Sequence, residues 1–187
     1  MFSLDLRNTD EKPASVASMT GTGAPGHALY DPTLIKHLTA DHANLLESLG
    51  RLEDHAQHRQ FVKIPGTLAR FRTDLLRHIE EENLHFYAYV AHALREDPLV
   101  AERLDRTSAR MAGIARLVCL FTKHYTDIPV TQANRDAFIR DLDVIASLLG
   151  DRIELEETSL YALYQPPHRA GQLPDEDCLL SLEHAAG

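Results

Sequence analysis

The chain has 187 residues, 44% of them hydrophobic and 25% charged, which is enough for one domain with a full core and typical of a globular protein. Its formal net charge of -9 argues against nonspecific nucleic-acid binding, which depends on Lys and Arg neutralising phosphates. No apolar run approaches the roughly 20 residues that span a bilayer, and no secretion signal is recognisable at the N-terminus. With two cysteines and no disulfide framework, we expect a cytoplasmic protein with neither nucleic acid nor membrane as partner.

Both ends of the chain carry the composition of tails. The first residues are rich in Ser, Thr, Gly and Pro without hydrophobic periodicity, which predicts a mobile arm. The arm ends at Asp31-Pro32, where an Asp N-cap and a Pro at the first helical position predict a helix start. Pro166-Pro167 should end the last helix. The expected boundaries are an N-terminal arm over 1–29, a helical domain over 30–165 and a C-terminal tail over 166–187.

Four amphipathic segments lie between these tails. In each, apolar residues recur at alternating spacings of three and four, which is typical of helices that face one another in a bundle. The segments cover about 32–57, from Pro65-Gly66 to about 95, from Asp97-Pro98 through Tyr125, and about 132–164. Because the connections are short, neighbouring helices should run antiparallel. The sequence therefore predicts an all-α, up-down-up-down antiparallel four-helix bundle with flexible N- and C-terminal tails.

The second and fourth segments repeat one another at an offset of 74 positions. The identical pairs are Leu75/Leu149, Ile79/Ile153, Glu80/Glu154, Glu82/Glu156, Tyr87/Tyr161 and Ala88/Ala162. In contrast, His78 is matched by Arg152. A His and a Glu four residues apart share one helical face and suit a metal ion, whereas an Arg stays protonated and cannot ligate one. One half of a two-part metal site is therefore present, and the other half is changed.

Five charged or titratable residues stand in the helix seams where Leu would be expected: His42, His78, Glu82, Arg152 and Glu156. Two carboxylates that face a bundle interior are costly without a compensating cation. The positive charge between Glu82 and Glu156 can come from a metal ion held with His42 and His78, from the guanidinium of Arg152, or from both.

The run Leu38-Thr39-Ala40-Asp41-His42 with Leu45, followed by His78-x-x-x-Glu82 with Phe86, resembles the hemerythrin and HHE cation-binding family. The resemblance covers about residues 31–164. It implies a four-helix bundle whose histidines and carboxylates hold a non-haem diiron centre. In that family the centre binds oxygen, or senses or handles oxygen, nitric oxide or iron.

The same resemblance assigns His42 to the family's first-helix histidine, and His78 with Glu82 to its second-helix pair. On the third helix the family places one or two histidines, where this chain has Met111 and Ala115. On the fourth helix the family has a His-x-x-x-acid pair, where this chain has Arg152 and Glu156. The expected metal ligands are therefore His42, His78, Glu82 and Glu156, with Arg152 as a cation substitute.

Three states of the site stay open. Arg152 can replace the metal and pair with Glu82 or Glu156; the four ligands can hold one iron, zinc or manganese ion; or a full diiron centre can form. An Arg152 that points inward should compete with metal, because like charges repel at low dielectric, whereas one that points outward leaves room for a single ion. His85, seven residues after His78, is interpreted as a surface histidine, with a substitute ligand as the less favoured alternative. Tyr87 and Tyr161 are expected to be aromatics at the edge of the core.

No nucleophile–base arrangement, phosphate-binding loop or cofactor fingerprint is present in the sequence, so we expect no enzyme. The first hypothesis is a non-catalytic binding or regulatory module with a partly lost metal site, acting on a protein partner in stress or signalling. The alternative is an iron-binding sensor or carrier that responds to oxygen, nitric oxide or redox state through a mononuclear or diiron site.

Overall fold

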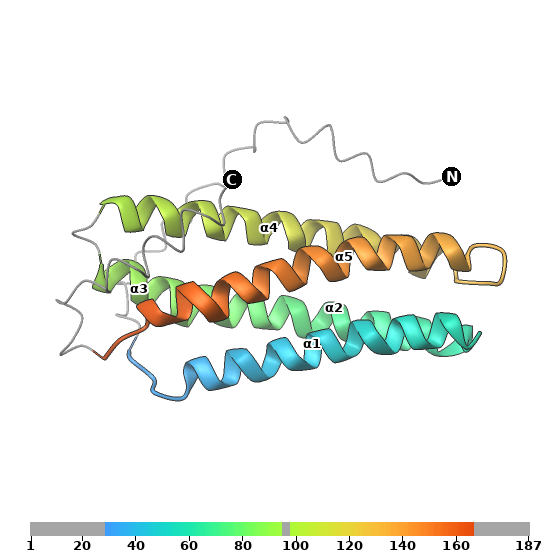
Figure 1. Cartoon of the computed structure of the whole chain (residues 1–187), viewed down its shortest axis with the longest axis horizontal. Helices are drawn as coiled ribbons and strands as arrows, with labels where there is room; N and C mark the ends of the chain where they lie inside the picture. Colours follow the sequence, from blue (N-terminus) through green and yellow to red (C-terminus); the bar gives the residue numbers. More distant parts are fainter. Residues whose placement is uncertain (1–28, 95–97, 167–187) are drawn as a thin grey trace, which may run out of the picture.

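The computed structural model describes residues 29–94 and 98–166, and within these ranges the chain forms four long helical segments and no strand (Figure 1). The first segment is α1 (Leu34–Gln57). After the short turn η1 (Phe61–Lys63), the second consists of α2 (Ile64–Glu81), η2 (Glu82–Tyr87) and α3 (Ala88–Ala93). The third is α4 (Pro98–Asp127). The fourth consists of α5 (Arg135–Leu155), η3 (Glu156–Leu160) and η4 (Tyr161–Leu163).

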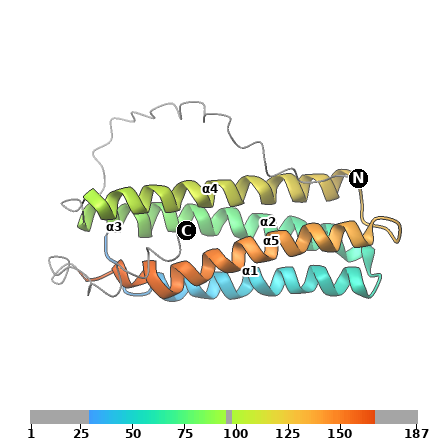
Figure 2. The same cartoon turned by 45° about the horizontal axis from the view of Figure 1, so that its top comes forward.

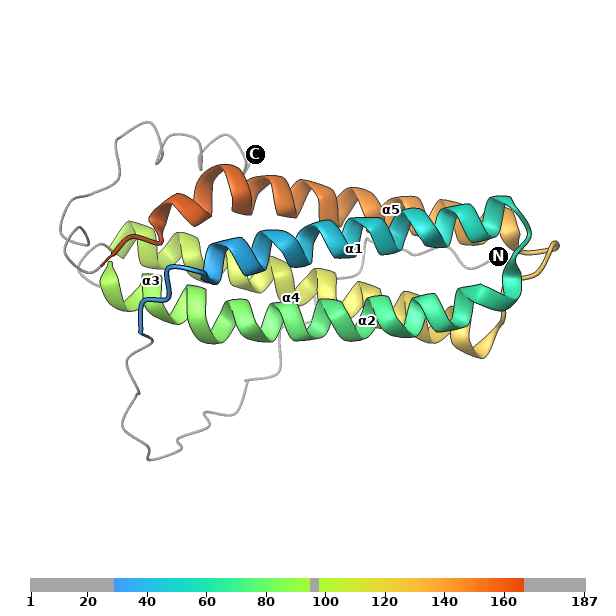
Figure 3. The same ribbon diagram turned by 90° about the horizontal axis from the view of Figure 1, so that it is seen from below.

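The segments run alternately up and down the bundle, which confirms the predicted architecture (Figures 1 and 3). Helix α1 contacts α2 and α5, and α4 contacts the same two helices on the opposite side, so the four segments enclose one interior (Figure 2). This topology follows from the short connections, which give the chain no length to cross the bundle before it turns back.

The start of the first helix differs slightly from the prediction. The regular helix begins at Leu34 rather than at Pro32. Asp31 still acts as a cap, because its Oδ1 accepts hydrogen bonds from the backbone N–H of Thr33 at 2.8 Å and from the Thr33 hydroxyl at 2.7 Å. A side-chain oxygen that accepts a free N–H near a helix start is the N-cap arrangement that Asp favours. The predicted arm over 1–29 and tail over 166–187 lie, apart from Leu29 and Pro166, outside the described residues.

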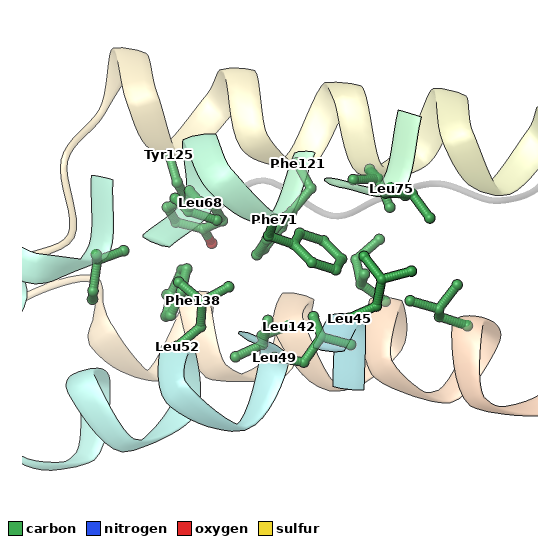
Figure 4. Close-up of a cluster of buried hydrophobic side chains, with 14 of the residues drawn as sticks. Leu45, Leu49, Leu52, Leu68, Phe71, Leu75, Phe121, Tyr125, Phe138 and Leu142 are labelled. Atoms are coloured by element: carbon green, nitrogen blue, oxygen red, sulfur yellow. The ribbon is translucent and has the colours of Figure 1, made fainter. Parts of the chain in front are cut away.

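The core consists of two apolar clusters. One fills the half of the bundle shown in Figure 4, where Phe71 and Phe138 are fully buried and the rings of Phe121 and Phe138 stack with centroids 5.7 Å apart. The other cluster is rich in aromatic residues and includes Phe86, Tyr161 and Tyr164. Each fully buried large apolar side chain contributes about 1.5–3 kcal/mol of transfer free energy.

The five polar seam residues lie between these clusters along the helices. His42, for example, stands between Leu38 of the aromatic cluster and Leu45 of the other cluster. Apolar side chains on both sides thus lower the effective dielectric around this layer and strengthen the electrostatic interactions in it. None of the helices in the described ranges has both the length and the apolar character needed to cross a bilayer.

Candidate metal centre

The first, second and fourth helical segments bring the five polar seam residues into the interior, as their spacing predicts. The exposed fraction is 5% for Arg152 and 1% for each of the other four residues: His42, His78, Glu82 and Glu156.

The sequence repeat is also a structural repeat. Helix α2 passes into a π-helical turn at Glu82, and α5 passes into a π-helical turn at Glu156, the position that corresponds to Glu82 in the repeat. A π turn adds one residue to a helical turn and therefore rotates everything after it relative to an α-helix. Such turns are frequent at functional sites. Here they occur in both helices at the carboxylate of the polar layer.

Three ligand-type side chains converge in this layer. The Nε2 atoms of His42 and His78 are 3.1 Å apart, and Oε2 of Glu156 is 3.2 Å from Nε2 of His42. One ligand atom from each of the three residues lies within 4.8 Å of the other two. When two donor atoms each lie about 2.0–2.1 Å from a common ion and the donor–ion–donor angle is about 90–110°, the two donors are roughly 2.9–3.4 Å apart. The two short distances fall in that interval, so these residues can share one ion.

Glu157 determines which nitrogen of His42 faces the site. Its Oε1 is 2.8 Å from Nδ1 of His42, so Nδ1–H donates to the carboxylate when the ring is neutral. The lone pair of His42 then lies on Nε2, toward His78 and Glu156. A carboxylate behind a histidine in this way is the usual support of a metal ligand. Asp41 lies behind His78, but its Oδ2 is 3.9 Å from Nδ1, which is too long for a hydrogen bond.

Without a metal ion, a proton can supply the positive charge on the histidine side of the layer. Burial lowers the pKa of His42, but hydrogen bonds to Glu156 and Glu157 outweigh burial and raise the pKa above its ordinary value. Burial and the nearby charge of His42 lower the pKa of His78 to about 4. The metal-free layer therefore favours a proton on His42 and keeps His78 neutral.

Arg152 points inward and supplies a second positive charge. Its Nη2 forms an ion pair with Oε1 of Glu156 and donates a hydrogen bond to the hydroxyl of Tyr87. The sequence suggested that an inward arginine would compete with a metal ion, and this stays a prediction. In the structure the carboxylate of Glu156 is divided between Arg152 and His42, since Oε1 faces Arg152 and Oε2 faces His42. The negative charge between the two positions reduces the repulsion that a divalent ion would meet there.

Glu82 is buried in the same layer. It does not belong to the group of three ligand residues that the described part of the chain brings together. Burial, with the negative charge of Glu156 as a further cause, raises the pKa of Glu82 to about 8. The hydroxyl of Tyr161 donates to its Oε1 at 3.4 Å. At neutral pH Glu82 is therefore mainly protonated, and its role as a metal ligand stays a prediction.

Comparison with family models agrees with this geometry. A model described as the hemerythrin HHE cation binding domain matches residues 33–164, which span the whole bundle. The chain belongs to the hemerythrin family. Searches of curated proteins and of solved structures found no match. The resemblance inferred from the motifs around His42 and His78 is thus confirmed, and with it the expectation of a cation-binding domain.

The residues of this hemerythrin-family domain do not fit a diiron centre. On α4, Met111 is 3% exposed and packs in the apolar core, and neither it nor Ala115 is a ligand for a hard cation. On α5, the guanidinium of Arg152 stands where the family places a histidine. Among the side chains described along α4, none joins the ligand group that His42, His78 and Glu156 form. The described residues thus bring together one group of three donors, which suits a single ion.

Sequence reasoning missed three contributors to the polar layer. Glu157 supports His42, and the Tyr87 and Tyr161 hydroxyls contact the layer in addition to packing in the aromatic cluster. The available signal for the two tyrosines was that both positions carry Tyr in the 74-residue repeat. His85 is exposed, which agrees with its interpretation as a surface histidine, and it lies in the π turn over Glu82–Tyr87.

Proposed function

We propose that this hemerythrin-family domain binds a single divalent transition-metal ion, ferrous iron above all, through His42, His78 and Glu156. It acts as a non-catalytic sensor or regulatory module that passes the state of the site to a protein partner. The observation that carries the proposal is the spacing of Nε2 of His42 from Nε2 of His78 and Oε2 of Glu156, at 3.1 and 3.2 Å. Two histidines and one carboxylate are the donor set of many non-haem ferrous sites.

The surrounding side chains prepare these donors. Glu157 holds the His42 ring with Nε2 turned inward, and Arg152 fixes one oxygen of Glu156 so that the other faces the histidines. The Tyr161 hydroxyl lies 3.3 Å from Nε2 of His42 and closes the layer on the side of the aromatic cluster. A ferrous ion held here would retain open coordination positions for a small ligand such as oxygen or nitric oxide.

Exchange between a proton and a metal ion is the chemistry that the layer supports. Hydrogen bonds to Glu156 and Glu157 raise the pKa of His42 despite its burial, and a proton on Nε2 occupies the nitrogen that would otherwise bind the ion. Metal binding must displace that proton, so the apparent affinity should increase with pH. Helices α1 and α2 and the π turn η3 each contribute one ligand, so a bound ion couples the positions of these three elements.

A second candidate function is a metal-free module in which Arg152 replaces the ion permanently. The supporting observation is the buried ion pair of Arg152 with Glu156, which already supplies the positive charge that a carboxylate in this layer requires. In that case the domain would act through its surface alone.

Titration of the EDTA-treated full chain with Zn²⁺, followed by calorimetry at pH 7.5, distinguishes the two candidates. We expect one site per chain whose affinity falls by about 100-fold or more in His78→Ala, since one of three ligands is lost. His85→Ala is the matched control, because His85 is an exposed histidine on the same helical segment. Equal zinc uptake by the two variants, or none by the wild-type chain beyond what exposed histidines bind, would favour the metal-free module.

A further inference from the structure

The histidine of α2 lacks the support that the histidine of α1 has. Nδ1 of His42 is 2.8 Å from the carboxylate of Glu157, whereas Nδ1 of His78 is buried and has no hydrogen-bond partner among the described residues. For Nε2 of His78 to hold an ion, its lone pair must face the site, and the ring proton must then lie on Nδ1. A buried N–H without an acceptor is rare in proteins and unfavourable. The ring of His78 therefore requires an acceptor behind it.

Asp41 lies closest to fulfilling this requirement. Its Oδ2 is 3.9 Å from Nδ1 of His78, and its Oδ1 accepts a hydrogen bond from Nη2 of Arg77 at 3.1 Å. A hydrogen bond of the usual length would need the carboxylate to approach the ring by about 1 Å. The His78 side chain is 1% exposed and that of Asp41 is 17% exposed, so the ring lies inside the core and the carboxylate at its border.

The surroundings of Asp41 leave its carboxylate free to make this movement. Asp41 lines a cavity of about 190 Å³ between α1 and α2, so close packing does not hold it in place. Its partner Arg77 is 59% exposed, and ion pairs with one partner in water contribute little to stability. The pair with Arg77 therefore offers little resistance to a shift toward His78.

A support of this kind already exists around His42. The ligand residue Glu156 of η3 is followed by Glu157, which contacts the histidine of α1. On α1, the ligand His42 is preceded by Asp41, which lies behind the histidine of α2. Neighbouring residues of a helix point about 100° apart, so one side chain can face the ion while the next faces an adjacent helix. Helix α1 packs along α2 in the arrangement that this requires (Figure 3).

We propose that Asp41 is a positioning residue for His78, whose Nδ1–H donates a hydrogen bond to the Asp41 carboxylate when Nε2 holds the ion. This inference rests on the single-ion site of the proposed function. A carboxylate in this place fixes the orientation of the ring and raises the basicity of Nε2. Because Arg77 holds the other carboxylate oxygen, Asp41 also connects the ligand to an exposed side chain of α2.

Calorimetric titration of the full, EDTA-treated chain with Zn²⁺ tests the inference. Asp41→Ala should lower the affinity by about 10- to 100-fold, the usual effect of removing the support of a metal-bound histidine. Asp41→Asn should lose less, because its amide oxygen is still an acceptor. Arg77→Ala removes the same ion pair and keeps the carboxylate, and Asp74→Ala removes a carboxylate of the same cavity that pairs with Arg70. Both of these control variants should bind zinc like the wild-type chain.

The ring proton of His78 reports the hydrogen bond directly. In nitrogen-detected NMR spectra of the zinc-loaded chain, Nδ1–H of His78 should be protected from exchange with solvent in the wild type and in Asp74→Ala. The same proton should exchange rapidly in Asp41→Ala. A purely structural role of Asp41 in joining α1 to α2 would leave this proton unchanged.

The outcomes separate this inference from the proposed function. Equal losses of affinity in Asp41→Ala and Arg77→Ala, or a protected His78 proton in Asp41→Ala, would overturn the inference. Normal zinc binding by Asp41→Ala together with weak binding by His78→Ala would overturn it and leave the single-ion site intact. If His78→Ala binds zinc like the wild-type chain, both the site and its support by Asp41 are wrong.

Discussion

Replacement of Arg152 by Met should strongly destabilise the metal-free protein. The change removes the ion pair with Glu156 and the hydrogen bond to Tyr87, and it leaves the 1% exposed carboxylate of Glu156 with His42 as the remaining neighbour that can carry a positive charge. Breaking a buried pair from one side typically costs about 3–5 kcal/mol, because the remaining charge stays buried. For a chain of this size, 1 kcal/mol corresponds to a shift of about 2–4 °C in Tm, so the expected loss is roughly 6–20 °C.

Thermal and urea unfolding of the EDTA-treated proteins measure this loss. Arg70→Met is a matched control, because Arg70 precedes Asp74 by four residues just as Arg152 precedes Glu156, but the Arg70 side chain is 74% exposed. An exposed pair of this kind contributes only about 0.3–0.5 kcal/mol. Addition of Zn²⁺ should raise the Tm of Arg152→Met more than that of the wild-type chain, since an ion can replace the lost charge. Similar stabilities for Arg152→Met and Arg70→Met would refute the assignment of Arg152 as a structural cation.

Three further outcomes are expected. Glu157→Gln should weaken Zn²⁺ binding by about 10- to 100-fold in competition with a chromophoric chelator, whereas unchanged affinity would show that Glu157 does not orient His42. In metal-free protein the free energy of unfolding should fall as pH rises from about 6.5 to 8. Folding raises the pKa of Glu82 to about 8 and that of His42 above 6.5. The folded chain therefore binds more protons than the unfolded chain over this interval, and it loses stability as these protons are released. Urea unfolding at several pH values measures this slope, which should be shallower in Glu82→Gln; a wild-type stability that rises with pH would contradict the assignment. Phe71→Ala should cost about 3–5 kcal/mol in the same assay, because its ring is fully buried, and a loss below 1 kcal/mol would be inconsistent with the described core.

The architecture was predictable because the signals for it are local. Apolar residues at alternating spacings of three and four define a buried helical stripe in any one segment, and short connections then leave an antiparallel bundle as the simple solution. The helix starts were less certain, as Asp31 shows: its side chain caps as expected, but the regular helix begins at Leu34. Small shifts of this kind depend on the geometry of a single turn.

The convergence of His42, His78 and Glu156 was predictable from the sequence, whereas their role as metal ligands stays a prediction. Their seam positions bring them to one layer, yet the contact of Glu157 with His42 depends on how η3 lies against α1. The two π turns could not be predicted from a hydrophobic period of 3.6 residues. The division of Glu156 between Arg152 and His42 is likewise a property of three-dimensional placement.

The iron content of the full chain, measured by elemental analysis after anaerobic loading with ferrous iron and removal of excess metal, tests the single-ion site most directly. One iron per chain, absent from His78→Ala and retained by His85→Ala, is the expected result. Two irons per chain would contradict the single-ion site, and no iron in the wild-type chain would leave Arg152 as the permanent cation of the layer.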